Sequence, residues 1–252
     1  MTVLEAVGLG KAFGGVLALD GVSFSVEAGE MLAMIGPNGA GKSTCFNLLG
    51  GQLSPDAGRV RLAGRDITGL APRRLARLGV ARTFQITAVF ASMTVRENVQ
   101  VALQAHHHRS LRFWRAAHTS FREAADRLLA QVDMLAAADR AAGVLAYGDL
   151  KRVELALALA TNPTLLLMDE PTAGMAAAER GALMALVRKL ADASGLAVLF
   201  TEHDMDVVFG VADRVLVLNR GTLIAAGAPD AIRADARVRE VYLGATGATQ
   251  RC

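Results

Sequence analysis

The segment 36–44, GPNGAGKST, has the residue types and the spacing of a phosphate-binding loop. Its glycines allow backbone N–H groups to surround phosphate oxygens, and Lys42 can add a positive charge at the β- and γ-phosphates. The hydroxyl of Ser43 is a candidate ligand of Mg²⁺. The alternative is an ordinary glycine turn before a helix, with Lys42 on the surface. The residues expected to bind a nucleotide here are Asn38, Gly39, Gly41, Lys42, Ser43 and Thr44.

A second candidate for this chemistry is the segment LLLMDE (165–170), in which an apolar run ends in two acids. In α/β sheets, ligands bind beyond the carboxyl ends of the strands, where Asp169 and Glu170 would lie. We expect Asp169 to hold Mg²⁺, directly or through water, and Glu170 to polarise the attacking water as base or orienter. Taken alone, the pair could be two solvated acids after a strand, but the phosphate-binding loop favours the catalytic interpretation.

Three further residues are weaker candidates for the same site. Gln85 follows the short run ARTF and could bind Mg²⁺ or water, although a glutamine taken alone is more often an ordinary polar residue. His203 follows the apolar run LAVLFT and could hydrogen-bond a γ-phosphate, although a lone histidine is more often structural. Phe13 could stack on adenine, although an aromatic residue in a β region is usually part of the core.

A second glycine-containing turn occurs in LAYGDLKRVELALALA (145–160), ahead of a helix expected from Leu150. The free N–H groups and the dipole at a helix N-terminus favour an anion. Tyr147, Gly148 and Asp149 are therefore further candidates for nucleotide contact. The alternative is a plain helix cap.

The elements that must position these residues follow from the hydrophobic pattern. The apolar runs 31–35, 165–168 and 196–201 predict buried strands, and alternation over 21–26 predicts a half-buried strand. Helices are expected from Lys42 to the glycine pair at 50–51, from Pro72, after the capping-box pair Thr94 and Glu97, and over 176–194. Hairpins are expected with turns at 64–65 and 219–221, and two short helices after Pro229. Strands alternating with helices indicate a mainly parallel sheet covered on both faces.

Composition narrows the class of protein. The chain has 252 residues, of which 52% are hydrophobic and 5% aromatic, so it is long enough for a sizeable core. A membrane-spanning helix needs about 20 consecutive apolar residues, and no apolar run is that long. The N-terminus also lacks the pattern of a signal peptide, so we expect a cytoplasmic chain. The net charge of +3 is too small to argue for nucleic acid. The two cysteines, Cys45 and Cys252, do not form a disulfide framework.

The segment 106–122 contains four arginines, four histidines and no acid, and we expect a loop and a helix inserted into the main fold. It could face lipid headgroups or a membrane partner. Consecutive histidines rarely converge on one metal ion, so a solvated surface segment is the simpler interpretation.

The order of these motifs resembles the ATP-binding subunit of ABC transporters over nearly the whole chain. Within that family, the chain is most similar to the ATPase of branched-chain amino acid importers. The segments that carry this narrower resemblance are FGGVLALDGVSF, GVARTFQ, MTVRENV, LAYGDLKRVELA, TEHDMDVVFGVADRVLVLNRG and VREVYLG. The resemblance implies an α/β P-loop NTPase with a mainly parallel core sheet, an N-terminal antiparallel β region and an inserted helical subdomain. It implies one cassette over 1–252, with an ATPase lobe (1–86 and 161–252) and a helical lobe (87–160).

The resemblance also implies a working dimer, in which the signature turn around Gly148 meets the ATP held by a second ATPase subunit. The sequence departs from the broad family in two places. Ala146 stands where serine is commonest, which we interpret as a mark of this branch. Ala176 stands where asparagine or aspartate is usual in a loop that crosses the dimer interface, which questions communication between the two sites but not the chemistry.

As implied by the resemblance, the cofactors are ATP and Mg²⁺, and the function is ATP hydrolysis that powers solute import. The partners would be a second ATPase subunit, two membrane-spanning permease subunits that dock near Gln85, and indirectly an external binding protein. The chain would lie on the cytoplasmic face of the inner membrane. The alternatives are an ABC ATPase for another solute (urea, amides, aromatic acids or a lipid), a soluble ABC ATPase of DNA repair or ribosomes, and a P-loop kinase. A short insertion and a single cassette disfavour the second, and LAYGD disfavours the third.

Overall fold

The computed structural model describes residues 1–83, 89–106 and 121–247 of the chain. Its centre is a six-stranded sheet in the order β10-β9-β3-β8-β7-β6, in which every pairing is parallel except that of β10 with β9. The strands are β3 (Met31–Ile35), β6 (Val80–Thr83), β7 (Leu165–Asp169), β8 (Ala197–Thr201), β9 (Arg214–Asn219) and β10 (Thr222–Gly227). The predicted α/β class with a mainly parallel core sheet is confirmed.

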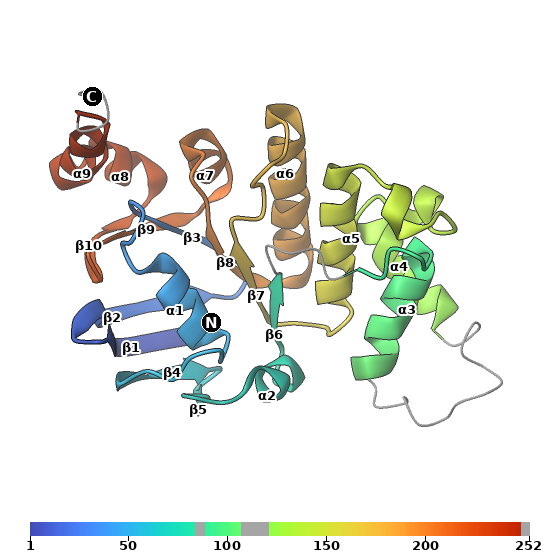
Figure 1. Cartoon of the computed structure of the whole chain (residues 1–252), viewed down its shortest axis with the longest axis horizontal. Helices are drawn as coiled ribbons and strands as arrows, with labels where there is room; N and C mark the ends of the chain where they lie inside the picture. Colours follow the sequence, from blue (N-terminus) through green and yellow to red (C-terminus); the bar gives the residue numbers. More distant parts are fainter. Residues whose placement is uncertain (84–88, 107–120, 248–252) are drawn as a thin grey trace.

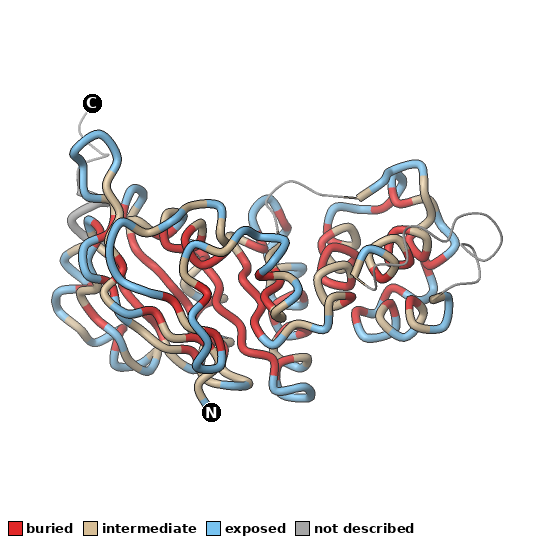
Figure 2. The backbone as a smooth tube through the Cα atoms, turned by 90° about the horizontal axis from the view of Figure 1, so that it is seen from below, coloured by how far each residue is buried: buried red, intermediate tan, exposed pale blue. Residues whose placement is uncertain are grey.

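Both faces of this sheet are buried, because successive side chains of a strand point to opposite faces. Met31, Ala33 and Ile35 of β3 pack with the helices α5 and α6 in one core cluster. Leu32 and Met34 pack on the other face with α1 and the N-terminal sheet. Figure 1 shows α6 and α7 on one side of the sheet and α1 with β1 and β2 on the other, and Figure 2 shows the buried backbone between them. The continuous apolar runs of the sequence therefore correspond to strands covered on both sides.

A second, antiparallel sheet has the order β2-β1-β4-β5. Its strands are β1 (Thr2–Phe13), β2 (Val16–Glu27), β4 (Ala57–Leu62) and β5 (Arg65–Asp66). Val22 and Val26 are buried while Ser23 is exposed, which confirms the predicted alternation. The β4–β5 turn consists of Ala63 and Gly64, both with positive φ, so the expectation of a turn at 64–65 was one residue late.

The α-helices are α1 (Lys42–Leu49), α2 (Pro72–Arg77), α3 (Val95–His106), α4 (Arg122–Gln131), α5 (Tyr147–Leu159), α6 (Ala177–Ser194), α7 (Met205–Val211), α8 (Pro229–Ala234) and α9 (Ala236–Gly247). Two single 3₁₀ turns, η1 (Leu135–Ala137) and η2 (Ala142–Val144), precede α5. The capping box is confirmed, since Thr94 N–H donates to Glu97 (2.8 Å) and Glu97 N–H donates to the Thr94 hydroxyl (3.2 Å). Among the described residues, no helix is long and apolar enough to cross a membrane.

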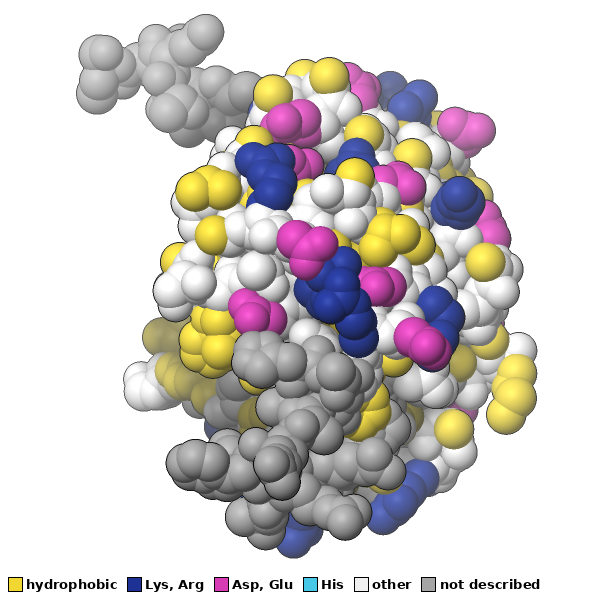
Figure 3. Space-filling view, turned by 90° about the vertical axis from the view of Figure 1, so that its right-hand side faces the viewer, with side chains coloured by type: hydrophobic (Ala, Val, Ile, Leu, Met, Phe, Trp, Pro, Cys, Tyr) yellow, Lys and Arg dark blue, Asp and Glu magenta, His cyan; other side chains and the backbone are white. Residues whose placement is uncertain are grey.

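Helices α3, α4 and α5 form the end of the molecule that lies away from the N-terminal sheet (Figure 1). Figure 3 shows Lys and Arg side chains interspersed with Asp and Glu on this end. Arg96 of α3 pairs with Asp126 of α4 at 2.6 Å and also with Asp139, so ion pairs join these helices. The basic segment of the sequence lies between α3 and α4, and its residues 107–120 lie outside the described part of the chain.

Candidate functional site

The phosphate-binding loop connects β3 to α1, as its motif predicts. Gly36 and Gly41 have positive φ values of 154° and 105°. A Cβ atom would lie 2.2 Å from the Leu218 carbonyl oxygen at Gly36 and 2.5 Å from the Ala18 carbonyl oxygen at Gly41. No other residue fits either position, because both the backbone conformation and the space exclude a side chain. Asn38 and Gly39 of the loop are exposed, as is Ser43 in the first turn of α1, and Thr44 is half-buried.

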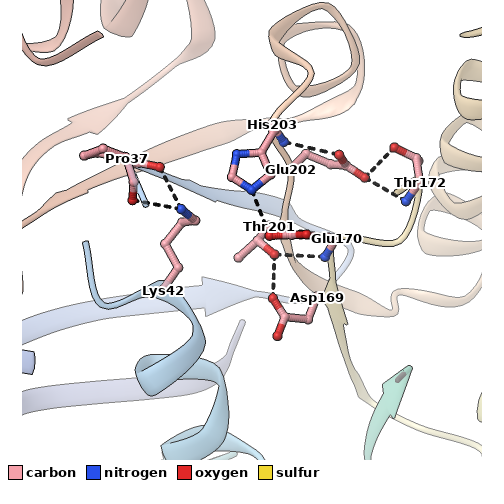
Figure 4. Close-up of polar contacts among 9 residues, drawn as sticks. Pro37, Lys42, Asp169, Glu170, Thr172, Thr201, Glu202 and His203 are labelled. Atoms are coloured by element: carbon pink, nitrogen blue, oxygen red, sulfur yellow. Dashed lines mark hydrogen bonds and ion pairs between the residues drawn. The ribbon is translucent and has the colours of Figure 1, made fainter. Parts of the chain in front are cut away.

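Lys42 is the first residue of α1, and its ammonium group lies inside the loop. Nζ donates to the carbonyl oxygens of Gly36 (2.7 Å) and Pro37 (3.1 Å), as Figure 4 shows. Burial lowers the pKa of Lys42, and the charges of Glu170 and then Asp169 oppose this shift. The structure therefore brings Lys42 within electrostatic reach of both acids of the LLLMDE segment.

Asp169 is the last residue of β7, and two donors from different strands hold its carboxylate. The Thr201 hydroxyl of β8 donates to Oδ1 (2.8 Å), and Arg82 of β6 donates to Oδ2 (3.2 Å). Asp169 and Thr201 are register partners in the parallel β7–β8 pair, which brings their side chains together. Thr201 is fully buried, so this hydrogen bond is shielded from water.

Glu170 follows β7 with a φ of 50°, a left-handed conformation that is uncommon for a residue other than glycine. Its N–H group donates to the Thr201 hydroxyl (3.0 Å) and carbonyl (3.2 Å) oxygens, which hold this conformation. The side chain then reaches His203, whose Nε2 lies 2.8 Å from Glu170 Oε1. Figure 4 shows Lys42, Asp169, Glu170 and His203 around one region, as expected. Strained backbone of this kind is frequent at functional sites.

Three residues that the sequence did not single out complete this region. They are Arg82 and Thr201, described above, and Glu202. Glu202 is buried, and its Oε1 accepts hydrogen bonds from the N–H (2.9 Å) and the hydroxyl (2.7 Å) of Thr172. This contact joins the segment after β7 to the segment after β8. Sequence spacing carries no signal for such contacts, because they depend on which strands are neighbours.

The roles of two weaker candidates, Phe13 and Gln85, stay predictions. Phe13 is 47% exposed at the end of β1, and Lys11 Nζ lies 5.7 Å from its ring centroid. It is therefore no core residue, and its role in adenine stacking stays a prediction. Gln85 lies outside the described residues, so its predicted contact with Mg²⁺ or water also stays a prediction.

The signature residues differ in detail from the expectation. Helix α5 begins at Tyr147 with Ala146 as N-cap, so Gly148 and Asp149 belong to its first turn, and the predicted start at Leu150 was wrong. Gly148 has no positive φ and is buried, so its backbone conformation does not require glycine. An added Cβ would lie 3.2 Å from Oε1 of Glu179, at the start of α6. The N-terminus of α5 therefore lies beside the N-terminus of α6.

The loop before α6 links the signature to the histidine. The Tyr147 hydroxyl donates to the carbonyl oxygen of Ala173 (3.2 Å). Arg180 donates to the carbonyl oxygen of Met175 (2.9 Å) and to Asp204 (2.9 Å), the residue after His203. Ala176 is the exposed N-cap of α6, and its methyl side chain cannot accept a hydrogen bond from the first N–H groups of the helix. Arg180 thus supplies a polar connection for this loop, while Ala176 supplies none.

Within one chain, the signature and the phosphate-binding loop do not meet. Figure 1 shows the N-terminus of α5 on the far side of β7 and α6 from α1.

The residues of the site also bear on whether it can bind a metal ion. Among the described residues no group of three His, Cys, Asp or Glu could hold a metal ion. One carboxylate (Asp169) and one hydroxyl (Ser43) instead fit Mg²⁺ that is bound together with substrate phosphates.

Comparisons with known proteins agree with this geometry. The sequence profile of the ABC transporter family matches residues 19–173, and that of the branched-chain amino acid ATP-binding cassette transporter matches residues 222–248. The high-affinity branched-chain amino acid transport ATP-binding protein BraF of Pseudomonas aeruginosa is 41% identical over 96% of this chain and 98% of its own length. The corresponding protein LivG of Escherichia coli is 40% identical over the same shares.

Solved structures give the same result. An ATP-binding cassette of an ABC transporter in its ADP conformation is 35% identical, with a TM-score of 0.86 over 97% of this chain and 99% of that chain. A dimeric cassette in a post-hydrolysis state with ADP and phosphate is 25% identical, with a TM-score of 0.74 over 90% and 98%. The chain therefore belongs to the ABC transporter family, in which it is an ATP-binding cassette that hydrolyses ATP.

Proposed function

We propose that this chain is the ATP-hydrolysing subunit that powers the import of branched-chain amino acids across the cytoplasmic membrane. The observation that carries the solute class is the similarity to BraF and LivG over nearly the whole chain, together with the branched-chain profile at 222–248. An importer for another solute, such as urea, amides, aromatic acids or a lipid, is the second candidate. The solute itself would be bound by other subunits.

Within one chain, the candidate residues would share the steps of ATP binding and hydrolysis. Lys42 and the loop N–H groups would bind the β- and γ-phosphates of ATP, and Phe13 would stack on the adenine. Ser43, Asp169 and Gln85 would hold Mg²⁺, which supplies charge stabilisation at the phosphates when it is bound. Glu170 would orient or deprotonate the attacking water, and its 2.8 Å contact with His203 would keep its carboxylate in place.

The other half of the site would come from a second ATPase subunit. Tyr147, Gly148 and Asp149 belong to the first turn of α5. In Figure 1 this helix lies away from α1, which supports a contact with the partner's nucleotide. The N–H groups and the dipole of α5 would then face the γ-phosphate across the interface. ATP would join the two subunits, and its hydrolysis would remove the charge that holds them together. A homodimer and a heterodimer with a sister ATPase both satisfy this geometry.

One of the two permease subunits would dock on a cavity of about 380 Å³ between the edge of the sheet and the helical end, and the other on the second ATPase subunit. Its wall is mostly apolar, with Leu75 and Ala76 from α2, Val101 from α3 and Leu157 from α5. Glu154 adds a buried carboxylate whose Oε1 has no hydrogen-bond partner among the described residues. An apolar surface with one available acceptor fits a short helix of a membrane subunit. The chain would then lie peripherally on the cytoplasmic face of the membrane, and an external binding protein would be an indirect partner. We also propose the division into an ATPase lobe (1–86 and 161–252) and a helical lobe (87–160).

Uptake of labelled leucine, isoleucine and valine in cells that lack this chain tests the proposal. We expect uptake to fall and to return with the intact chain but not with Lys42→Ala. Normal uptake of all three amino acids, combined with loss of uptake of urea, an amide or an aromatic acid, would establish the second candidate instead.

A further inference from the structure

Arg82 lies between two regions that have separate roles in the proposed function. It belongs to β6, the edge strand of the core sheet, and its side chain is only 13% exposed. One amino group, Nη2, donates to Asp169 Oδ2 at 3.2 Å. The other, Nη1, donates to Asn47 Oδ1 (2.9 Å) near the end of α1 and to Gln52 Oε1 (3.0 Å) beyond that end. The guanidinium group therefore bridges the carboxylate at the end of β7 and the segment after α1.

The contacts of Arg82 fix the orientation of the Asp169 carboxylate. Thr201 occupies one oxygen of Asp169 and Arg82 the other, from opposite sides. Each carboxylate oxygen can accept about two hydrogen bonds, so each keeps an acceptor site for Mg²⁺ or for water bound to it. The planar guanidinium holds its partners in a fixed fork, whereas a lysine at the same place would keep the charge but lose the two-sided geometry.

The other end of this bridge reaches the docking cavity. Gln52 is exposed, and both Gln52 and Arg82 belong to the cavity wall. Gly50 leaves the space for their contact, because an added Cβ would lie 2.4 Å from Gln52 Oε1 and 3.1 Å from Arg82 Nη1. A continuous path of hydrogen bonds thus runs from the cavity through Gln52 and Arg82 to Asp169.

We propose that Arg82 is a positioning residue of the ATPase reaction, which holds the Asp169 carboxylate for Mg²⁺ and ties it to Gln52 in the docking cavity. This inference rests on the proposed function, in which Asp169 holds Mg²⁺ and a permease segment fills the cavity. A segment that displaces Gln52 changes the hydrogen bonding of Nη1, and the rigid guanidinium transmits this change to Asp169.

The test uses the full-length chain with Arg82→Lys and Gln52→Ala, and Arg188→Lys as control. Arg188 makes comparable contacts with Asp213 (2.6 Å) and the Gly29 carbonyl oxygen (2.7 Å) on another part of the fold. The readouts are kcat at saturating ATP and the ratio of ADP affinities with and without Mg²⁺. For Arg82→Lys we expect kcat to fall about 10-fold or more and the affinity ratio to fall at least about 3-fold, while ADP affinity without Mg²⁺ stays within about 2-fold.

Gln52→Ala is an exposed change that leaves folding intact, and we expect it to shift the same ratio in the same direction by a smaller factor. A merely structural arginine would lower the melting temperature without changing the ratio, as we expect for Arg188→Lys. The inference is overturned if Arg82→Lys and Gln52→Ala both keep the ratio of the unmodified chain. A different failure, in which the unmodified chain shows no Mg²⁺-dependent hydrolysis, would instead contradict the proposed function.

Discussion

Replacing Thr201 by valine tests whether the hydroxyl between β7 and β8 organises the acidic pair. Valine has nearly the shape of threonine, so the change removes the O–H group from a fully buried position without opening a cavity. Asp169 Oδ1 loses its 2.8 Å hydrogen bond. Glu170 N–H loses its 3.0 Å contact with the hydroxyl but keeps the Thr201 carbonyl oxygen at 3.2 Å. A hydrogen bond to a charged group contributes about 1.5–3 kcal/mol.

Loss of this energy has two expected effects. Because 1 kcal/mol shifts the melting temperature of a chain of this size by about 2–4 °C, Thr201→Val should lower it by about 3–12 °C. If the whole contribution is realised in the transition state, kcat should fall by about 10- to 150-fold, at 1.36 kcal/mol per factor of ten.

Thr201→Ser is the matched control. It keeps the hydroxyl and removes one buried methyl group, which costs about 0.5–1.5 kcal/mol of stability. Its kcat should stay within about 3-fold of the unmodified chain. Thermal unfolding and a phosphate-release assay at saturating ATP and Mg²⁺ measure both quantities. Equal losses of kcat in the serine and valine variants would refute the role of the hydroxyl.

Further perturbations probe other parts of the site. Lys42→Ala should weaken ATP binding measured by calorimetry, since its ammonium group lies in the loop, and retained affinity would count against the phosphate-binding role. Gly148→Asp places a carboxylate beside Glu179, so it should bind ATP but fail to pair with a second ATPase subunit in size-exclusion chromatography. Gly181→Asp, at an open position of α6, is its control, and pairing by both variants would remove Gly148 from the interface. Burial raises the pKa of Cys45 to about 12, so its thiolate is scarce at pH 8. Cys45 should therefore resist maleimide in the folded chain, and rapid labelling of Cys45 would contradict its burial.

The strands and the phosphate-binding loop could be predicted from the sequence, because each depends on local pattern. The run 31–35 is apolar at every position since both faces of β3 are covered. The contacts of Thr201, Glu202 and Arg82 could not be predicted, because they follow from the parallel register of β6, β7 and β8. Residues distant in the chain become neighbours there without any recognisable spacing.

The start of α5 shows a different limit. Glycine is a poor helix former, so Gly148 favoured a turn, and the helix was expected from Leu150. The structure overrides this preference, since Gly148 lies in the first turn of α5, where an added Cβ would make a close contact of 3.2 Å with the Glu179 carboxylate. Phe13 shows the reverse case, in which a residue type common in cores lies at an exposed strand end.

We expect ATP to lie between this chain and a second ATPase subunit. The direct measurement is the structure of the assembled transporter with Glu170→Gln, ATP and Mg²⁺, since this change should keep ATP bound and lower turnover by about 100-fold or more. We expect the γ-phosphate to lie about 3 Å from Lys42 Nζ and from the signature amide of the opposite subunit, with Gly148 facing the other nucleotide. A bound ATP that only one subunit contacts would contradict the account.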